Sequence, residues 1–257
     1  PIALHPAMRR PLLAQRCLVE GARVLAYWTA HLLDVAEAHP DAAQRAAAEA
    51  RVGLLTPIVK AYLTDVGCRV ASEALQVFGG YGYIHEYGAE QSFRDSRIAP
   101  IYEGTNEIQA IDLMLRKVAA DAGARYGELL AEIEAGCDAV AGEDGMAGHA
   151  ARLRESVAAM RAAVATVLAT AASDAEYPFR VAGDFLQASA LLLMGFFWLR
   201  SERAARAALR ARPHDVFLTG KCASAAHFFA FLLPEAALHL ARVRAGQAPL
   251  PQVSLPE

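Results

Sequence analysis

The chain has 257 residues, of which 55% are hydrophobic, so it can bury a sizeable core in one large domain or two smaller ones. Its 25 basic and 28 acidic residues give a formal net charge of -3, which argues against nucleic acid as the main partner because phosphate-binding proteins usually carry a basic excess. The most apolar stretch, residues 188–199, is shorter than the roughly 20 residues that a membrane-spanning helix needs, so we predict a buried helix there and no membrane span.

The cysteines lie far apart, without the Cys-x-x-Cys or Cys/His spacing of zinc sites; they are Cys17, Cys68, Cys137 and Cys222. This arrangement predicts neither a metal site nor a disulfide framework, and a reducing cytoplasm is the expected location. The first residue is Pro1, and no signal-peptide pattern follows it. We interpret the sequence as a piece of a longer protein or a processed product, although an initiator methionine can also be removed from a complete one.

Two long helical patterns open the chain. Residues 5–39 carry apolar side chains at helical spacing and predict a helix that begins near Pro6, because proline fits a first turn. Pro40 ends this helix, and Asp41 is the predicted N-cap of the next. The second helix is expected to run to residue 78, broken or kinked near Pro57 because proline removes a backbone donor. Two long helices with so short a link predict an antiparallel hairpin.

The middle of the chain departs from this regularity. Gly79-Gly80 ends the second helix, and residues 81–102 are predicted to be irregular, with one short helix around 90–94. Thr105 is the predicted N-cap of a new helix, and Glu107 lies in its first turn, where a carboxylate suits the helix dipole.

The remaining sequence predicts helices and no strands. The helix from Thr105 is expected to continue, weakly broken near Gly123, to Val140, and a loop follows at residues 142–148. Three more amphipathic helices are predicted, at residues 149–175, 179–210 and 215–244.

The predicted fold class is therefore all-α, an up-and-down helical bundle followed by a second helical bundle. We divide the chain into a first domain at residues 1–122, a helical extension at residues 123–245 and a tail at residues 246–257. The tail carries three prolines and is expected to be a surface strap or disordered.

Glu103 is the candidate for chemistry. A carboxylate directly before a helix is most often only a capping group, but the residues next to Glu103 favour a catalytic role. Gly104 lets another molecule approach the backbone closely, and backbone N–H groups at a helix start can bind a developing negative oxygen. Tyr102 and Pro100 are expected to limit solvent around the carboxylate. We therefore interpret Glu103 as a general base in a half-enclosed pocket.

The segment QVFGGYGYIHEYGAEQSFRDSRIAPIYEGTNEIQ, residues 76–109, resembles the C-terminal helical domain of acyl-CoA dehydrogenases. The resemblance is carried by Q-x-x-G-G and I-Y-E-G-T in the right order, with an R-D pair between them, and it covers roughly residues 5–120. The region after Gly123 is similar to the helical extension of larger members, among which 3-methylthiopropionyl-CoA dehydrogenases come closest.

The resemblance implies a role for each motif. Glu103 would remove the α-proton of an acyl-CoA, and its backbone N–H would bind the thioester carbonyl oxygen, with Tyr102 and Gly104 at the substrate. The implied flavin contacts, the first five of them to the FAD of another subunit, are Gln76, Val77, Phe78, Gly79, Gly80, Thr105 and Glu107. Glu107 stands where some members have glutamine, which turns a hydrogen-bond donor into an acceptor.

The resemblance also implies FAD as cofactor, an electron-transfer flavoprotein as electron acceptor, and a homo-oligomer of two or four subunits. The family's N-terminal helical domain and middle β-domain are not in these residues, so we expect the isolated chain to be inactive and to bind FAD weakly. Two other functions stay open. One is an acyl-CoA oxidase, which would consume oxygen instead of reducing a flavoprotein, and the other is a non-catalytic helical assembly or regulatory module.

Other residue groups have simpler explanations. Arg94 and Asp95 are predicted to form an ion pair that fixes the loop, and His85 lacks partners at metal-ligand spacing. Aromatic or core packing is the expected role of Tyr81, Tyr83, Tyr87, Phe196, Phe197, Trp198, Phe228, Phe229 and Phe231. A solvated basic face is expected from Arg200, Arg203, Arg206, Arg210 and Arg212.

Overall fold

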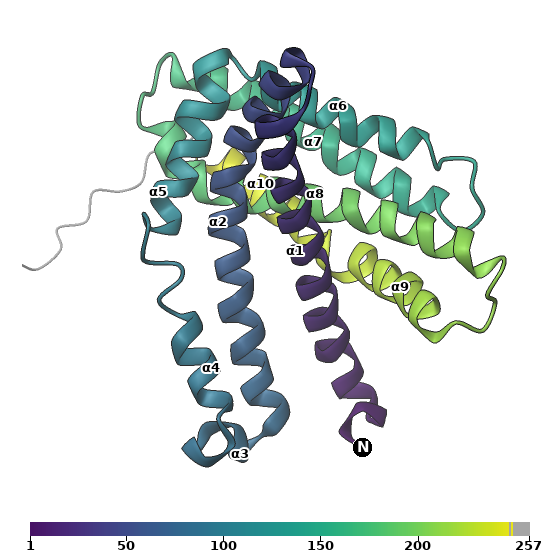
Figure 1. Ribbon diagram of the computed structural model, residues 1–257. Helices are drawn as coiled ribbons and strands as arrows, with labels where there is room; N and C mark the ends of the chain where they lie inside the picture. The colour runs from purple at the N-terminus through teal and green to yellow at the C-terminus, as the bar shows by residue number, and fades with distance from the viewer. Residues whose placement is uncertain (247, 249–257) are drawn as a thin grey trace, which may run out of the picture.

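The computed structural model describes residues 1–246 and 248, and every regular element in this part of the chain is helical, which confirms the all-α prediction (Figure 1). The predicted tail lies almost wholly outside the described residues. The α-helices are α1 (Pro6–Ala38), α2 (Ala42–Phe78), α3 (Gly80–Tyr83), α4 (Ala89–Ser96), α5 (Asn106–Ile111), α6 (Ala124–Asp138), α7 (Ala147–Ala171), α8 (Tyr177–Leu209), α9 (Val216–His227) and α10 (Glu235–Ala245). Tighter 3-10 turns lie at Ile2–Leu4, His85–Tyr87 and Ala119–Asp121, and π-helical segments at Asp112–Val118 and Phe228–Leu232.

Helices α1 and α2 form the predicted antiparallel hairpin (Figure 1). Asp41 is the N-cap of α2, where its Oδ1 accepts a hydrogen bond from the Ala43 backbone N–H at 2.8 Å. Of the break or kink predicted at Pro57, the break is wrong, because α2 is one continuous helix. Leu54, Leu55 and Ile58 are all fully buried around this proline. Each such side chain contributes about 1.5–3 kcal/mol, so together they outweigh the roughly 3 kcal/mol that an interior proline costs.

The second half of the chain is built around α8. Nearly every residue from Phe185 to Leu199 in this helix is buried, and α1, α2, α6, α7, α9 and α10 all pack against it. The apolar core is continuous from Leu18 and Leu55 in the hairpin to Phe228 in the extension. The two predicted bundles therefore share one core, and the residue boundary between them stays a prediction.

Two segments are long and apolar enough to cross a membrane by length and composition, Tyr177–Leu209 and Val216–Ala245. In the first, 83% of the most apolar window is buried inside the protein, which is what the core helix of a globular fold requires. The second is interrupted between α9 and α10.

The helix that starts at α5 ends earlier than the sequence indicates. Instead of one helix to Val140, the α5 helix passes into a π-helical segment and a 3-10 turn, and α6 starts only after Gly123. Ala122 and Gly123 both adopt left-handed backbone, with φ of 54° and 80°. The Gly123 N–H bonds the Val118 carbonyl at 2.8 Å, which closes the helix end. The predicted break near Gly123 is present, but it is complete and not weak, because Ala122 and Gly123 both leave the helical backbone.

Two further segments differ from prediction. The predicted helix 215–244 is divided into α9 and α10 by a π-helical segment followed by Pro234, which has no backbone N–H to continue the ladder. Residues 81–102 contain α3, a 3-10 turn and α4, so this region is more helical than expected, although the short helix at 90–94 is found within α4.

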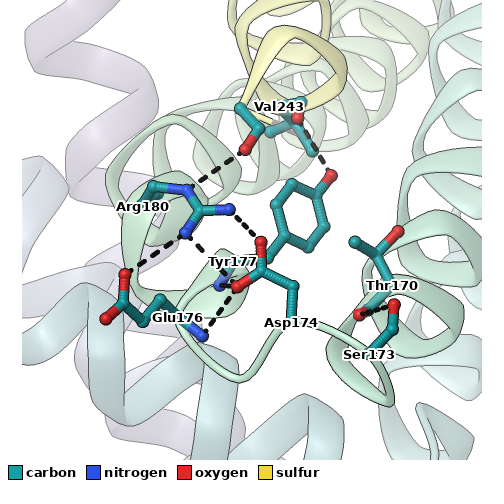
Figure 2. A network of polar contacts seen from close by, with 8 residues as sticks. Thr170, Ser173, Asp174, Glu176, Tyr177, Arg180 and Val243 are labelled. Atoms are coloured by element: carbon teal, nitrogen blue, oxygen red, sulfur yellow. Dashed lines mark hydrogen bonds and ion pairs between the residues drawn. The ribbon is translucent and has the colours of Figure 1, made fainter. Parts of the chain in front are cut away.

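A polar network fastens the α7–α8 connection to the end of α10 (Figure 2). The Asp174 carboxylate accepts backbone N–H bonds from Glu176 at 3.1 Å and Tyr177 at 3.2 Å, and it pairs with the Arg180 guanidinium. The Tyr177 hydroxyl donates to the Val243 carbonyl at 2.9 Å. The hydrogen bond from Arg180 holds the pKa of Asp174 below its usual range.

The left-handed turn at Gly123 predicts a stability defect for Gly123→Ala. A Cβ at this position would lie 3.0 Å from Val164 Cγ1 in addition to the left-handed strain, so we expect the free energy of unfolding in urea to fall by at least about 1–2 kcal/mol. Gly127→Ala is the matched control. Its Cβ would meet nothing within 4 Å inside a regular helix, so it should stabilise the chain by up to about 1 kcal/mol. Equal effects of the two variants would contradict this account.

The Asp174 network predicts a pH-dependent contribution to stability. Because the folded-state pKa of Asp174 is lowered, its contribution is complete above the unfolded pKa of about 4 and is lost as the pH falls through the lower folded value. Asp174→Ala should therefore lower the urea midpoint at pH 7, and the difference from wild type should shrink below about pH 4. A difference that is the same at pH 7 and pH 3 would rule out this linkage.

Candidate active site

The candidate base lies in the turn that connects α4 to α5. Glu103 and Gly104 both have left-handed backbone, with φ of 54° and 82°. The turn is closed by the Asn106 N–H, which donates to the Pro100 carbonyl at 3.1 Å, and by Gln109 Nε2, which donates to the Glu103 carbonyl at 3.1 Å. A non-glycine residue in this region of backbone space is uncommon and is concentrated at functional sites. The sequence gives no sign of this conformation at Glu103.

Helix α2 supports the turn from below. Lys60 Nζ donates to the Gly104 carbonyl at 2.6 Å and to Asn106 Oδ1 at 2.9 Å. Asn106 Nδ2 in turn donates to Asp65 Oδ1 at 2.7 Å. None of these three residues was predicted from the sequence, because Lys60 and Asp65 lie in an ordinary amphipathic helix far from the motif. Only the position of Asn106 between Thr105 and Glu107 could have drawn attention to it.

The pocket expected around Glu103 is not formed by this chain. Glu103 and Gly104 are exposed, and 54% of the Tyr102 surface is accessible, so the tyrosine does not shield the carboxylate as predicted. The reason is that nothing in the described residues packs over the outer side of the turn. Thr105 is confirmed as the N-cap of α5, since its Oγ1 accepts from the Ile108 N–H, although the bond is long at 3.4 Å.

A hollow of about 450 Å³ lies beside the turn, between α2, the end of α4 and the start of α5. Its lining residues are Asp65, Cys68, Arg97, Pro100, Ile101, Thr105, Asn106 and Glu107. Burial raises the pKa of Asp65, an effect that hydrogen bonds from Asn106 and Gln187 partly offset. The structure therefore brings Thr105 and Glu107 to one polar hollow next to Glu103.

The Gln76–Gly80 motif lies elsewhere, at the far end of α2 (Figure 1). From Lys60, under the Glu103 turn, to Gln76 is 16 residues, or about 24 Å at 1.5 Å per residue. Gly79 ends the helix with φ of 63°, and a Cβ on it or on Gly80 would meet nothing within 4 Å. Gln76, Phe78 and both glycines are exposed, and Val77 is half-buried. The two motifs do not meet within one chain.

The aromatic packing predicted for the tyrosines that follow this motif is present only in part. The rings of Tyr81 and Tyr87 lie 5.0 Å apart, but these two tyrosines and Tyr83 are exposed. The core prediction holds for Phe196, Phe197, Trp198, Phe228 and Phe229, which are buried, whereas Phe231 is 48% exposed.

The charged residues singled out in the sequence also differ in part from their predicted roles. The predicted Arg94–Asp95 ion pair is wrong, because Arg94 pairs with Glu90 at 3.7 Å, one helical turn earlier in α4. His85 Nδ1 contacts the same Glu90 at 3.2 Å, and the described residues contain no group of three or more potential metal ligands. The predicted basic residues on α8 and in the turn after it are partly neutralised by ion pairs, which are Arg203–Glu143, Arg206–Glu202 and Arg212–Asp215.

Comparison with known proteins covers both halves of the chain. Residues 1–118 match the family model described as acyl-CoA dehydrogenase, C-terminal domain, and residues 129–253 match the one described as acetyl-CoA dehydrogenase C-terminal like. The 3-methylmercaptopropionyl-CoA dehydrogenase of Ruegeria pomeroyi is 40% identical over 95% of this chain. A broad-specificity linear acyl-CoA dehydrogenase of Mycobacterium tuberculosis is 32% identical over 91%. The chain spans only 41% and 40% of the lengths of these two relatives.

Two solved structures share the fold. An acyl-CoA dehydrogenase from Bacillus anthracis, crystallised with FAD, superposes with a TM-score of 0.69 at 19% identity. The superposition covers 96% of this chain and 42% of the Bacillus anthracis chain. Caenorhabditis elegans ACDH-11, in complex with C11-CoA, superposes with a TM-score of 0.63 at 19% identity over 88% of this chain and 36% of its own. The fold, the two family models and the relatives agree, and the chain belongs to the acyl-CoA dehydrogenase family, with its C-terminal helical domain followed by the C-terminal-like helical region.

Proposed function

We propose that this chain is the C-terminal part of an FAD-dependent acyl-CoA dehydrogenase that introduces an α,β double bond into an acyl-CoA thioester, with Glu103 as the base. The observation that carries the proposal is the turn of the I-Y-E-G-T motif, which holds Glu103 in left-handed backbone with its side chain open to a bound molecule. The names of the relatives support the reaction class, and that of the Ruegeria pomeroyi enzyme supports a short thioether acyl group as one substrate to test.

In this reaction the Glu103 carboxylate takes the α-proton, and negative charge develops on the thioester oxygen. The family resemblance assigns the Glu103 backbone N–H to that oxygen, and a donor held in place before the reaction stabilises the charge at no cost in reorganisation. Tyr102 and Gly104 border the same exposed surface and would contact the acyl-CoA. FAD, when bound, accepts the β-hydride.

The residues present fit FAD in two separate places. Thr105 and Glu107, together with the Arg97 guanidinium, line the polar hollow next to the base. Gln76 to Gly80 offer an open, glycine-containing backbone about 24 Å away along α2, a surface on which a phosphate or adenosine group can lie closely. One flavin site needs both kinds of contact near one molecule, so we propose that a second subunit supplies the Gln76–Gly80 surface in a homo-oligomer. We also propose an electron-transfer flavoprotein as acceptor and a cytoplasmic location.

Replacing the base tests this function. In the full-length enzyme, Glu103→Gln should lower kcat by about 100- to 10,000-fold because the amide cannot take the α-proton, while far-ultraviolet circular dichroism stays unchanged. Glu155→Gln, an exposed carboxylate on α7, is the matched control and should keep wild-type turnover. An active Glu103→Gln enzyme would favour the non-catalytic helical module instead.

The open surface around Glu103, over which nothing in the described residues packs, predicts weak cofactor binding by the chain alone. Titrating FAD into this 257-residue chain should leave the flavin absorbance and fluorescence nearly unchanged, whereas the full-length protein should purify yellow. A stoichiometric FAD complex of the isolated chain would show that the site needs no other domain and would refute this part of the proposal.

A further inference from the structure

The Glu103 turn is held by Asn106 next to it and by side chains that lie outside the segment 76–109. The Lys60 ammonium donates a hydrogen bond to the Gly104 carbonyl at 2.6 Å, and Gly104 is the residue that follows Glu103. The same ammonium donates to Asn106 Oδ1 at 2.9 Å, so it bridges the turn and the first residue of α5. A hydrogen bond from a charged donor is roughly twice as strong as one between neutral groups. Lys60 therefore restrains the backbone of the residue next to Glu103.

Asn106 connects the turn to α2 through further hydrogen bonds. Its Nδ2 donates to Asp65 Oδ1 at 2.7 Å and to the Ala61 carbonyl at 3.0 Å, while its Oδ1 accepts from the Lys60 ammonium at 2.9 Å. The amide thus uses both its donor and its acceptor toward α2. This network is half-buried, and a polar network fixes one geometry when its members are satisfied.

Asp65 connects the turn to the second half of the chain. Its Oδ1 accepts from Asn106, and its Oδ2 accepts from Gln187 Nε2 of α8 at 2.8 Å. Gln187 lies in the region matched by the C-terminal-like family model, whereas the other members of the network lie in the region matched by the C-terminal domain model. The contact therefore reaches from one family region into the other.

A second left-handed pair in the same chain shows that such a turn does not need this support. Ala122 and Gly123 have nearly the same φ values as Glu103 and Gly104. The hydrogen bonds of this pair stay within the same short turn: Ala122 N–H donates to the Ala119 carbonyl, and Gly123 N–H donates to the Val118 carbonyl and to the Asp121 carboxylate. The Glu103 turn instead recruits a lysine, whose side-chain freedom costs up to about 2 kcal/mol to restrict. The additional hydrogen bonds from Lys60 therefore restrain the turn that carries Glu103, the proposed base, whose position must be accurate for proton transfer.

We propose that Lys60, Asp65 and Asn106 are positioning residues for Glu103, and that Gln187 makes the C-terminal extension part of this arrangement. The inference rests on the proposed role of Glu103 as the base. None of the four side chains needs to touch the substrate. Their effect is to hold the carboxylate and the neighbouring backbone N–H at the reacting atoms, so loss of the network lowers kcat more than it raises KM.

The test uses the full-length enzyme with FAD and an acyl-CoA substrate. Lys60→Met should lower kcat by about 100-fold, the loss expected for a misplacement of about 1 Å, with little change in KM. Lys60→Arg should recover much of this loss, because a guanidinium can donate to the Gly104 carbonyl. Gln187→Leu should lower kcat by a smaller factor, although it lies in the other family region.

Glu235→Gln is the matched control for Gln187→Leu. It weakens a different contact between the extension and α2, the Arg69–Glu235 ion pair at 3.3 Å, and leaves the turn untouched. It should keep wild-type kcat. Hydrogen exchange by mass spectrometry on the same proteins should be faster over residues 103–109 in Gln187→Leu and unchanged there in Glu235→Gln.

The outcomes separate the two proposals. If Glu103→Gln is inactive while Lys60→Met and Gln187→Leu keep wild-type kcat, the positioning role is refuted and the dehydrogenase function stands. If Gln187→Leu and Glu235→Gln lower kcat equally, the effect comes from general loosening of the α2 surface, and the specific role of Gln187 is refuted. If Glu103→Gln is active, the proposed function fails and the positioning role fails with it.

Discussion

Burial of apolar side chains around Pro57 keeps α2 a continuous helix, and both halves of the candidate machinery depend on this one element. Lys60 and Asp65 hold the Glu103 turn from the middle of α2, while the Gln76–Gly80 backbone is presented at its end. A rigid helix between the two keeps them apart by a fixed distance. A broken α2 would let both surfaces move independently, and neither a shared flavin nor a second subunit could then be placed reproducibly.

Helix α8 packs against α2. It is buried over most of its length, and the hairpin and the extension both pack on it, so the two family regions share one core. Through Gln187, α8 also makes a polar contact with Asp65 beneath the candidate base. The extension is thus more than an appended bundle. Its central helix is part of the support on which the proposed chemistry stands.

Much of the fold follows from patterns that act over a few residues. Proline at the start of α1, the Asp41 and Thr105 caps and the apolar spacing all depend on neighbours within one or two turns, and the helices they predict are present. The errors arose where distant packing competes with a local rule. Pro57 did not break its helix because the core holds both sides, and the break at Gly123 was underestimated because Val164 on another helix fills the space beside it.

The sequence by itself determined the helical class, the family resemblance and the identity of Glu103 as the candidate base, because each is written in local spacing or in a contiguous motif. Only the tertiary structure decided that Glu103 has left-handed backbone, that its pocket is open within this chain, and that Lys60, Asp65 and Gln187 lie under the turn. Those facts depend on which surfaces of α2, α5 and α8 meet. Helical periodicity says which face of each helix is apolar, but not which polar side chains meet at the edge of the packed interface.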